Sequence, residues 1–122
     1  MITFGAVAPV DLLAVGEAFE DLVFFGLPRL PKPGEELKAP GFLQTVGGGA
    51  VITAIAAARC GLRCSVLGGL GEQAVRVLRE DNVGVLNLRR EHEAAAVTVA
   101  LSTKTNRSVV TFNGVNDALE AR

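Results

Sequence analysis

Apolar and polar positions alternate along the chain in short blocks that predict strands and helices. The run Asp11–Gly16 is apolar and closed by glycine, which is typical of a buried strand. Asp21–Gly26 is a second strand candidate, and Glu36–Thr45 is a third with weak alternation. Between them, Pro28–Gly34 is rich in proline, which fixes φ and bars helix. This segment is therefore expected to be an extended connector between two strands.

Two helices are predicted in the middle of the chain. The stretch Ala50–Cys60 is dense in alanine and stops before Gly61, a predicted helix C-cap. It is apolar nearly all round, so we expect it to be buried on most sides. The stretch Glu72–Glu80 is amphipathic and predicts a shorter helix.

Strands are predicted between and after these helices. Cys64–Leu67 lies between them, and Val83–Leu88 follows the second. Ala96–Ser102 and Arg107–Asn113 flank the polar turn Thr103–Asn106, which predicts a β-hairpin. Helices that alternate with strands predict the α/β class, with a parallel sheet and right-handed crossovers. The proline-rich excursion and the hairpin break this rhythm and are expected to form a second, smaller sheet.

Composition narrows the class of protein. The 122 residues suit one domain or a piece of one, and 49% hydrophobic with 20% charged residues excludes an intrinsically disordered chain. The net charge of −1 argues against nucleic acid as a partner. His92 is the single histidine, and Cys60 and Cys64 are the two cysteines, which excludes a multi-histidine metal site and a disulfide-dense scaffold. No metal-binding residues are predicted. The two cysteines are expected to be buried, structural thiols.

No targeting or membrane segment is expected from the pattern. The longest apolar run, Ala50–Ala58, is far shorter than the ~20 residues of a membrane span. The first 28 residues contain acids but no lysine or arginine, unlike a secretory signal. We therefore expect a cytoplasmic protein without a membrane partner.

The main candidate for a ligand-binding site is the glycine run Gly47–Gly49 before the first predicted helix. Three glycines there allow a ligand to approach the backbone, and the start of a helix favours polar or anionic groups. A tight turn with close helix packing explains the same residues equally well. The run lacks the Gly-Lys-Ser/Thr of a phosphate-binding loop and the spacing of a dinucleotide-binding turn. Asp21 follows the first strand, where a carboxylate either accepts hydrogen bonds from sugar hydroxyls or is a solvated loop acid. The pattern does not separate it from Glu17 and Glu20.

Several weak motifs occur in the order found in the ribokinase (PfkB) family of carbohydrate kinases, which the chain resembles from Asp11 to Leu119. Gly47 and Gly48, followed by small residues and Gly61, resemble the family's first signature. Gly114–Leu119 resembles the Gly-Ala-Asn segment that follows the family's lid hairpin.

This resemblance implies a ribokinase-like parallel sheet with helices on its faces plus a small β-sheet lid. The chain would be the N-terminal part of such a domain, and thus an incomplete domain. It implies lid strands at about 20–45 and 95–113, and α/β core elements at about 11–16 and 46–90.

The resemblance also implies an activity and a substrate site. Members transfer the γ-phosphoryl group of ATP, with Mg²⁺, to a hydroxyl of a sugar or related polyol. Asp21 would bind sugar hydroxyls, and Gly47 and Gly48 would line the pocket with Gly49 beside it. Ile52 stands where the signature has an asparagine that is often a sugar ligand, which implies a more apolar substrate or an altered pose.

The family's catalytic part does not match this chain. Its Gly-Ala-Gly-Asp motif, which carries the catalytic base, has no counterpart here, and Asp117 follows a hairpin instead. No catalytic residue is assigned, and neither ATP nor Mg²⁺ is expected to bind this chain strongly. Three hypotheses remain: the sugar-binding and lid half of a kinase, inactive alone; a stand-alone sugar-binding or dimerisation module; and a nucleotide-binding α/β domain. The lid or the exposed sheet edge is a candidate surface for a homodimer.

Overall fold

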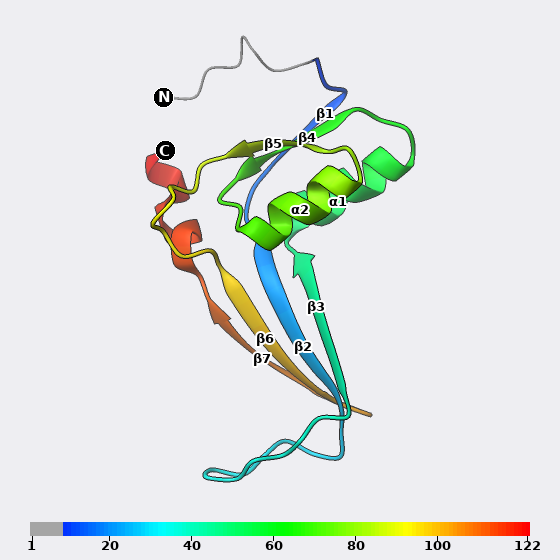
Figure 1. Ribbon diagram of the computed structural model, residues 1–122, viewed down its shortest axis with the longest axis vertical. Helices are drawn as coiled ribbons and strands as arrows, with labels where there is room; N and C mark the ends of the chain where they lie inside the picture. The colour runs from blue at the N-terminus through cyan, green and yellow to red at the C-terminus, as the bar shows by residue number, and fades with distance from the viewer. Residues whose placement is uncertain (1–8) are drawn as a thin grey trace.

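The computed structural model describes residues 9–122, whose strands form two separate sheets (Figure 1). The first sheet contains β1 (Leu12–Val15), β4 (Cys64–Gly68) and β5 (Gly84–Asn87) in the order β1-β4-β5. All its neighbouring strands are parallel. This arrangement confirms the predicted α/β class.

Two helices pack on one face of the parallel sheet. They are α1 (Gly49–Arg59) and α2 (Glu72–Glu80), which lie beside each other in Figure 1. Their buried side chains join those of the strands in one apolar cluster, as expected when a helix follows each parallel strand. The fully buried members with the largest side chains are Leu70, Leu78, Val51, Val66 and Val83.

The opposite face of the parallel sheet is only partly covered within the described residues. Because side chains alternate along a strand, Leu12 and Ala14 face the core while Leu13 and Val15 face away. The outward pair is 38% and 65% exposed, respectively. Parallel sheets are normally covered by helices on both faces. Here α1 and α2 cover one of the two faces.

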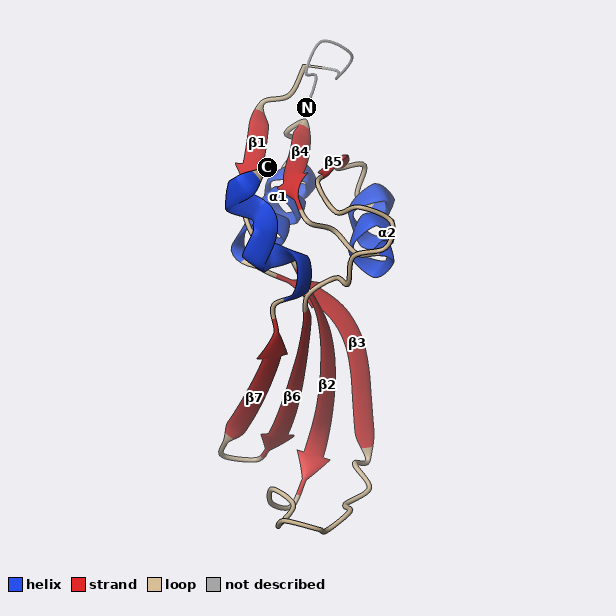
Figure 2. Ribbon diagram, turned by 90° about the vertical axis from the view of Figure 1, so that its left-hand side faces the viewer, coloured by secondary structure: helices blue, strands red, loops and turns tan. Residues whose placement is uncertain are grey.

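The second sheet projects from the α/β body (Figure 2). It has the order β3-β2-β6-β7 and consists of β2 (Phe19–Leu27), β3 (Gly41–Gly47), β6 (Val97–Thr103) and β7 (Arg107–Phe112). The β6–β7 pair is the predicted hairpin, and β2 is antiparallel to β3 but parallel to β6. The expectation of a second sheet is thus confirmed. With four strands against three, it is the larger of the two sheets within residues 9–122, so its predicted smaller size was wrong.

The 3-10 helix η1 (Gly114–Ala121) closes the described chain against the body. Asn116 on it is buried, and its side-chain amide donates a 3.1 Å hydrogen bond to the carbonyl oxygen of Ala18. The terminal Arg122 forms an ion pair with Glu93 and donates to the carbonyl oxygen of Leu88 at 2.7 Å. These contacts tie the end of the chain to the β1–β2 turn and to the segment that follows β5.

Three sequence predictions were wrong in detail. The third strand begins at Gly41 instead of Glu36, because the proline-bounded segment before it lacks a partner strand and Pro40 offers no N–H. Helix α1 is not buried on most sides, since only one of its faces meets the sheet and only Val51 and Ala54 are fully buried. Cys60 is exposed, because it caps the free end of α1.

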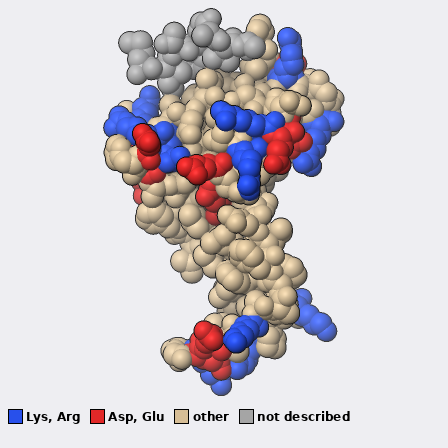
Figure 3. Space-filling model, viewed as in Figure 1, with Lys and Arg blue, Asp and Glu red and all other residues tan. Residues whose placement is uncertain are grey.

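Charged side chains gather on the body and at the tip of the β2–β3 connection, while uncharged ones cover the second sheet on the face shown in Figure 3. Arg29 and Glu35 pair at that tip. None of the helices within residues 9–122 has both the length and the apolar character that a membrane crossing requires.

Candidate functional site

The predicted site residues lie where the two sheets meet. At this junction β1 passes into β2, and β3 passes into α1. Gly48 sits between β3 and α1 with φ +100°, and a Cβ atom there would lie 2.3 Å from the carbonyl oxygen of Glu17. Only glycine fits both this conformation and this close approach. The glycine run therefore brings the start of α1 directly against the β1–β2 turn.

The structure brings Asp21 and Gly47 together. They lie on neighbouring antiparallel strands, with Phe19 opposite Gly47 and Asp21 opposite Thr45. The carboxylate of Asp21 leans across the strand, so that a Cβ atom on Gly47 would lie only 2.5 Å from its Oδ2. Glycine at position 47 thus leaves the space that this carboxylate occupies.

The Asp21 carboxylate has no hydrogen-bond partner within residues 9–122 and is only partly exposed. Burial raises its pKa, while the positive charge of Arg107 on β7 opposes the shift. The carboxylate oxygens are not fully buried, so they remain open to water or a ligand. Both oxygens are free to accept hydrogen bonds.

A pocket of about 480 Å³ opens at the same junction, beside the free edge of β1. Gly49 is the predicted site residue that lines it, and a Cβ atom on Gly49 would meet nothing within 4 Å. Phe19 also lines it and shares one face of β2 with Asp21, since side chains two residues apart point the same way. The remaining lining residues are Leu12, Ala14, Val15, Gly16, Glu17, Ala50 and Thr53.

Ile52 lies in the first turn of α1 and is 60% exposed. Its backbone N–H donates to the carbonyl oxygen of Gly48 at 3.0 Å, while its side chain has no polar atom. The start of α1 therefore presents an apolar side chain to solvent near the glycine run. Ile52 does not line the pocket.

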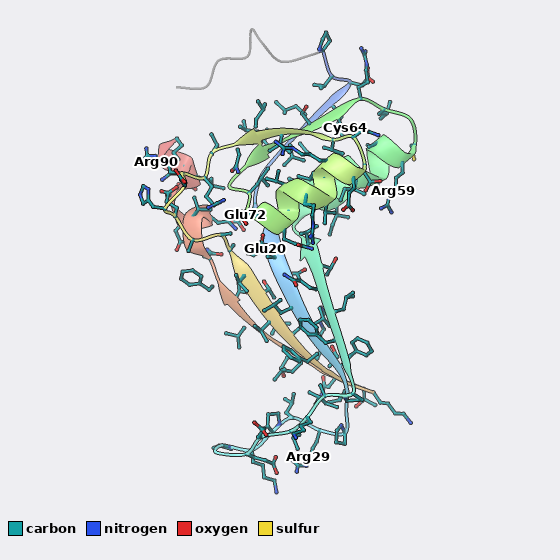
Figure 4. The ribbon with its side chains drawn as sticks, in the orientation of Figure 1. Glu20, Arg29, Arg59, Cys64, Glu72 and Arg90 are labelled. Carbon is teal, nitrogen blue, oxygen red and sulfur yellow. The ribbon has the colours of Figure 1, made fainter. Side chains whose placement is uncertain are left out.

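The three neighbouring acids, which the sequence left unseparated, occupy different places. Glu20 points away from Asp21, because they are successive residues of one strand, and its Oε1 accepts a 2.9 Å hydrogen bond from the backbone N–H of Gln73. In Figure 4 it lies at the start of α2, near Glu72, which is the favourable end of the helix for a carboxylate. Glu17 lines the pocket. Asp21 is thus the acid placed against Gly47.

Sequence reasoning missed Phe19 and Thr53 as pocket residues. The alternation Phe19–Asp21 along β2 could have placed Phe19 beside the acid, but nothing in the pattern located the turn of α1 that carries Thr53. Asp117 accepts a 2.7 Å hydrogen bond from the side-chain amide of Asn113. This local bond gives Asp117 a structural role.

The described residues do not fit an ATP–Mg²⁺ site. Within residues 9–122, no three His, Cys, Asp or Glu side chains come together as metal ligands. The start of α1 offers no lysine, serine or threonine in a phosphate-binding loop pattern.

The fold of the described residues combines a three-stranded parallel sheet and two helices with a separate four-stranded sheet. No protein-family model and no curated protein matches the sequence. Among solved structures, ribokinase from Cryptococcus neoformans var. grubii serotype A, in complex with ADP, has a TM-score of 0.69 and 28% identity over 84% of this chain. Arabidopsis thaliana ribokinase, complexed with ribose and ATP, has a TM-score of 0.67 and 24% identity over 89% of this chain.

The nucleoside kinase of Methanocaldococcus jannaschii, an archaeal member of the ribokinase family, has a TM-score of 0.76 and 18% identity over 91% of this chain. The chain covers 33%, 38% and 39% of the fungal, plant and archaeal chains, respectively. It thus spans little more than a third of the length of the structures that it matches. The chain is a partial ribokinase-like domain.

Proposed function

We propose that this chain is the sugar-binding and lid part of a carbohydrate kinase. The observation that carries the proposal is the half-buried Asp21 carboxylate, which has no partner among the described residues and lies against Gly47. The likeness to ribokinases supports it through the fold. The second sheet, residues 19–47 and 97–112, acts as the lid in this proposal.

The chemistry of the site follows from these groups. An ionised carboxylate accepts hydrogen bonds only, and its two oxygens suit two neighbouring hydroxyl groups of a sugar or polyol. Charge-assisted hydrogen bonds of this kind are roughly twice as strong as neutral ones. Gly47 leaves room for the Asp21 carboxylate, Gly48 lets α1 start against the β1–β2 turn, and Gly49 borders the pocket. Ile52 would contact an apolar part of the sugar.

The phosphoryl-transfer step belongs to groups outside this chain. In a complete kinase, ATP would supply the phosphoryl group and Mg²⁺ would balance its charge. The neighbours described with ADP or ATP support such a partner for the complete kinase. In this proposal, residues 9–122 bind and orient the acceptor hydroxyls without a catalytic base, so this chain alone is inactive. The protein acts in the cytoplasm.

A stand-alone sugar-binding or dimerisation module without catalysis is the second candidate. The exposed apolar side chains of the second sheet favour it, since Phe42, Val110 and Phe112 are 55%, 75% and 60% exposed. These three share the face of the sheet opposite Asp21, so a second copy on them would leave the sugar site free. A coding frame that continues beyond codon 122 into a Gly-Ala-Gly-Asp helix start favours the kinase, and a stop codon there favours the module.

Calorimetric titration of the chain with D-ribose, D-glucose and D-fructose tests the sugar site. Asp21→Asn removes the charge but keeps the shape, so it should weaken binding by roughly tenfold or more. Glu20→Gln is the matched control, because Glu20 lies on the other face of β2. Equal affinities for the wild type and Asp21→Asn would contradict the proposal.

A further inference from the structure

Two adjoining pockets lie along α2, outside the site described above. The first has a volume of about 480 Å³ and lies between the start of α2 and the strands β2 and β3. The second has a volume of about 550 Å³ and lies along α2 beside Val75. Glu72, Arg76 and Arg89 border both pockets, so the pockets meet at these three side chains and form one groove. Each volume is within the ~300–1,000 Å³ that is typical of small-molecule sites.

Charged side chains of both signs border this groove, and the acids equal the bases in number. They are Glu20, Glu72 and Glu80, with Arg76, Arg79 and Arg89. None of these six side chains forms an ion pair within residues 9–122. A groove with unpaired groups of both signs suits a ligand that itself carries both charges, because each ligand charge then meets its opposite.

The guanidinium of Arg89 is held in place by the backbone. Its Nε donates to the carbonyl oxygen of Leu70 at 2.8 Å, and its Nη1 donates to the carbonyl oxygen of Glu93 at 3.0 Å. Both acceptors are uncharged, so they do not neutralise the guanidinium, and its Nη2 has no partner within residues 9–122. A guanidinium fixed in this way loses little conformational freedom when it binds a carboxylate.

Arg76 supplies a second guanidinium, and Glu72 supplies a carboxylate beside it. The two residues lie one turn apart on the same face of α2. The Nη2 of Arg76 donates to the side-chain oxygen of Gln73, which is also an uncharged acceptor. In Figure 4, Glu72 lies at the start of α2 near Glu20, which has one oxygen engaged by the backbone N–H of Gln73. Two positive groups and one negative group are thus available where the pockets meet.

The two pockets differ in character. The first contains the side-chain amides of Gln44 and Gln73, which both donate and accept hydrogen bonds. The second is bordered by Val75 and by the side chains of Arg79 and Glu80, whose methylene stems are apolar. A ligand in the groove would therefore meet polar groups at one end, charged groups in the middle and an apolar surface at the other end.

We propose that this groove binds an α-amino acid with an apolar side chain. Arg76 and Arg89 hold its carboxylate, and Glu72 accepts hydrogen bonds from its ammonium group. The side chain of the amino acid packs against Val75. Neither pocket is bordered by Asp21 or by the glycine run, so this site is separate from the proposed sugar site and does not depend on it.

Calorimetric titration of the full chain with L-leucine and L-phenylalanine, and with analogues of each, tests the site. Isocaproate and hydrocinnamate lack the ammonium group, isoamylamine and phenethylamine lack the carboxylate, and glycine lacks the side chain. At least one of the two amino acids should bind about tenfold or more tightly than its analogues, because each analogue loses one of the three contacts. If neither amino acid binds, the charges are a solvated surface and the proposal is wrong. An analogue that binds as tightly as its amino acid would also overturn it.

Three variants test the assigned residues. Arg76→Gln should weaken binding of the amino acid by roughly tenfold or more, and Glu72→Gln should abolish its advantage over the analogue without an ammonium group. Arg90→Gln is the matched control, because it removes a positive charge next to Arg89 but Arg90 borders neither pocket and lies away from α2 in Figure 4. It should keep the wild-type affinity. Thermal melting shows that each variant is folded. Equal losses in Arg76→Gln and Arg90→Gln, or no loss in Arg76→Gln, would contradict the proposal.

Discussion

Replacing Gly47 by alanine perturbs the proposed sugar site by displacing the Asp21 carboxylate, while Asp21 itself is kept. The new Cβ atom would lie 2.5 Å from Asp21 Oδ2, whereas ordinary van der Waals contact begins at 3.4 Å. The carboxylate must therefore move by about 0.9 Å. Gly47 does not have a positive φ, so alanine strains the backbone little, and the displaced carboxylate accounts for the effect.

The loss follows from the hydrogen bonds that the displaced carboxylate can no longer make. A hydrogen bond to a charged group contributes about 1.5–3 kcal/mol, which corresponds to roughly a tenfold to hundredfold loss of affinity. Glu20→Gln is the control, because Glu20 lies on the other face of β2. We expect Gly47→Ala to lose sugar affinity and Glu20→Gln to keep it.

A double-mutant cycle tests whether the effect passes through Asp21. In an Asp21→Ala background the carboxylate is absent, so Gly47→Ala should cause no further loss. Calorimetry measures affinity, and thermal melting shows that each variant is folded. Wild-type affinity in Gly47→Ala, or an equal loss with and without Asp21, would show that the Asp21 carboxylate does not transmit the effect.

Three further predictions concern stability and assembly. The ion pair with Arg122 lowers the pKa of Glu93 to about 2, so the stabilisation that it gives the fold is present above about pH 4.5 and is lost as the pH falls toward 2. Glu93→Gln should therefore flatten the acidic part of a plot of melting temperature against pH. A plot for Glu93→Gln that runs parallel to the wild-type plot would contradict this. Leu78→Ala empties a fully buried position and should destabilise the fold by about 2–5 kcal/mol in urea unfolding, so a loss below 1 kcal/mol would be inconsistent with its packing. The chain should self-associate in analytical ultracentrifugation, because apolar side chains are exposed on both sheets. Val110→Lys should reduce association through the second sheet, and Val15→Lys should reduce association through the parallel sheet. A monodisperse wild-type monomer would contradict association through either sheet.

Much of the fold was predictable because its signals are local. The two helices are marked by glycine before and after α1 and by the amphipathic pattern of α2, and the structure places them at Gly49–Arg59 and Glu72–Glu80. The hairpin was predictable from two apolar runs around a polar turn. The parallel pairing of β2 with β6 was not, because about 70 residues separate strands whose pairing is set by tertiary contacts.

The sequence suggests candidate site residues, but it does not give their geometry. The glycine run and the resemblance singled out Asp21 and Gly47, yet no local pattern states that the carboxylate occupies the space beside that glycine. Glu20 and Asp21 are adjacent acids that differ only in the face of β2 on which they lie. Their separate roles depend on the position of α2, which tertiary packing sets.

Asp21 and the glycine run form the sugar site in the function that we propose. Backbone-amide NMR of the labelled chain during a D-ribose titration tests it most directly. The amide signals of Asp21, Gly47, Gly48 and Gly49 should shift together, with one affinity, and these shifts should disappear in Asp21→Asn. Shifts confined to other regions, or unchanged shifts in Asp21→Asn, would contradict the claim.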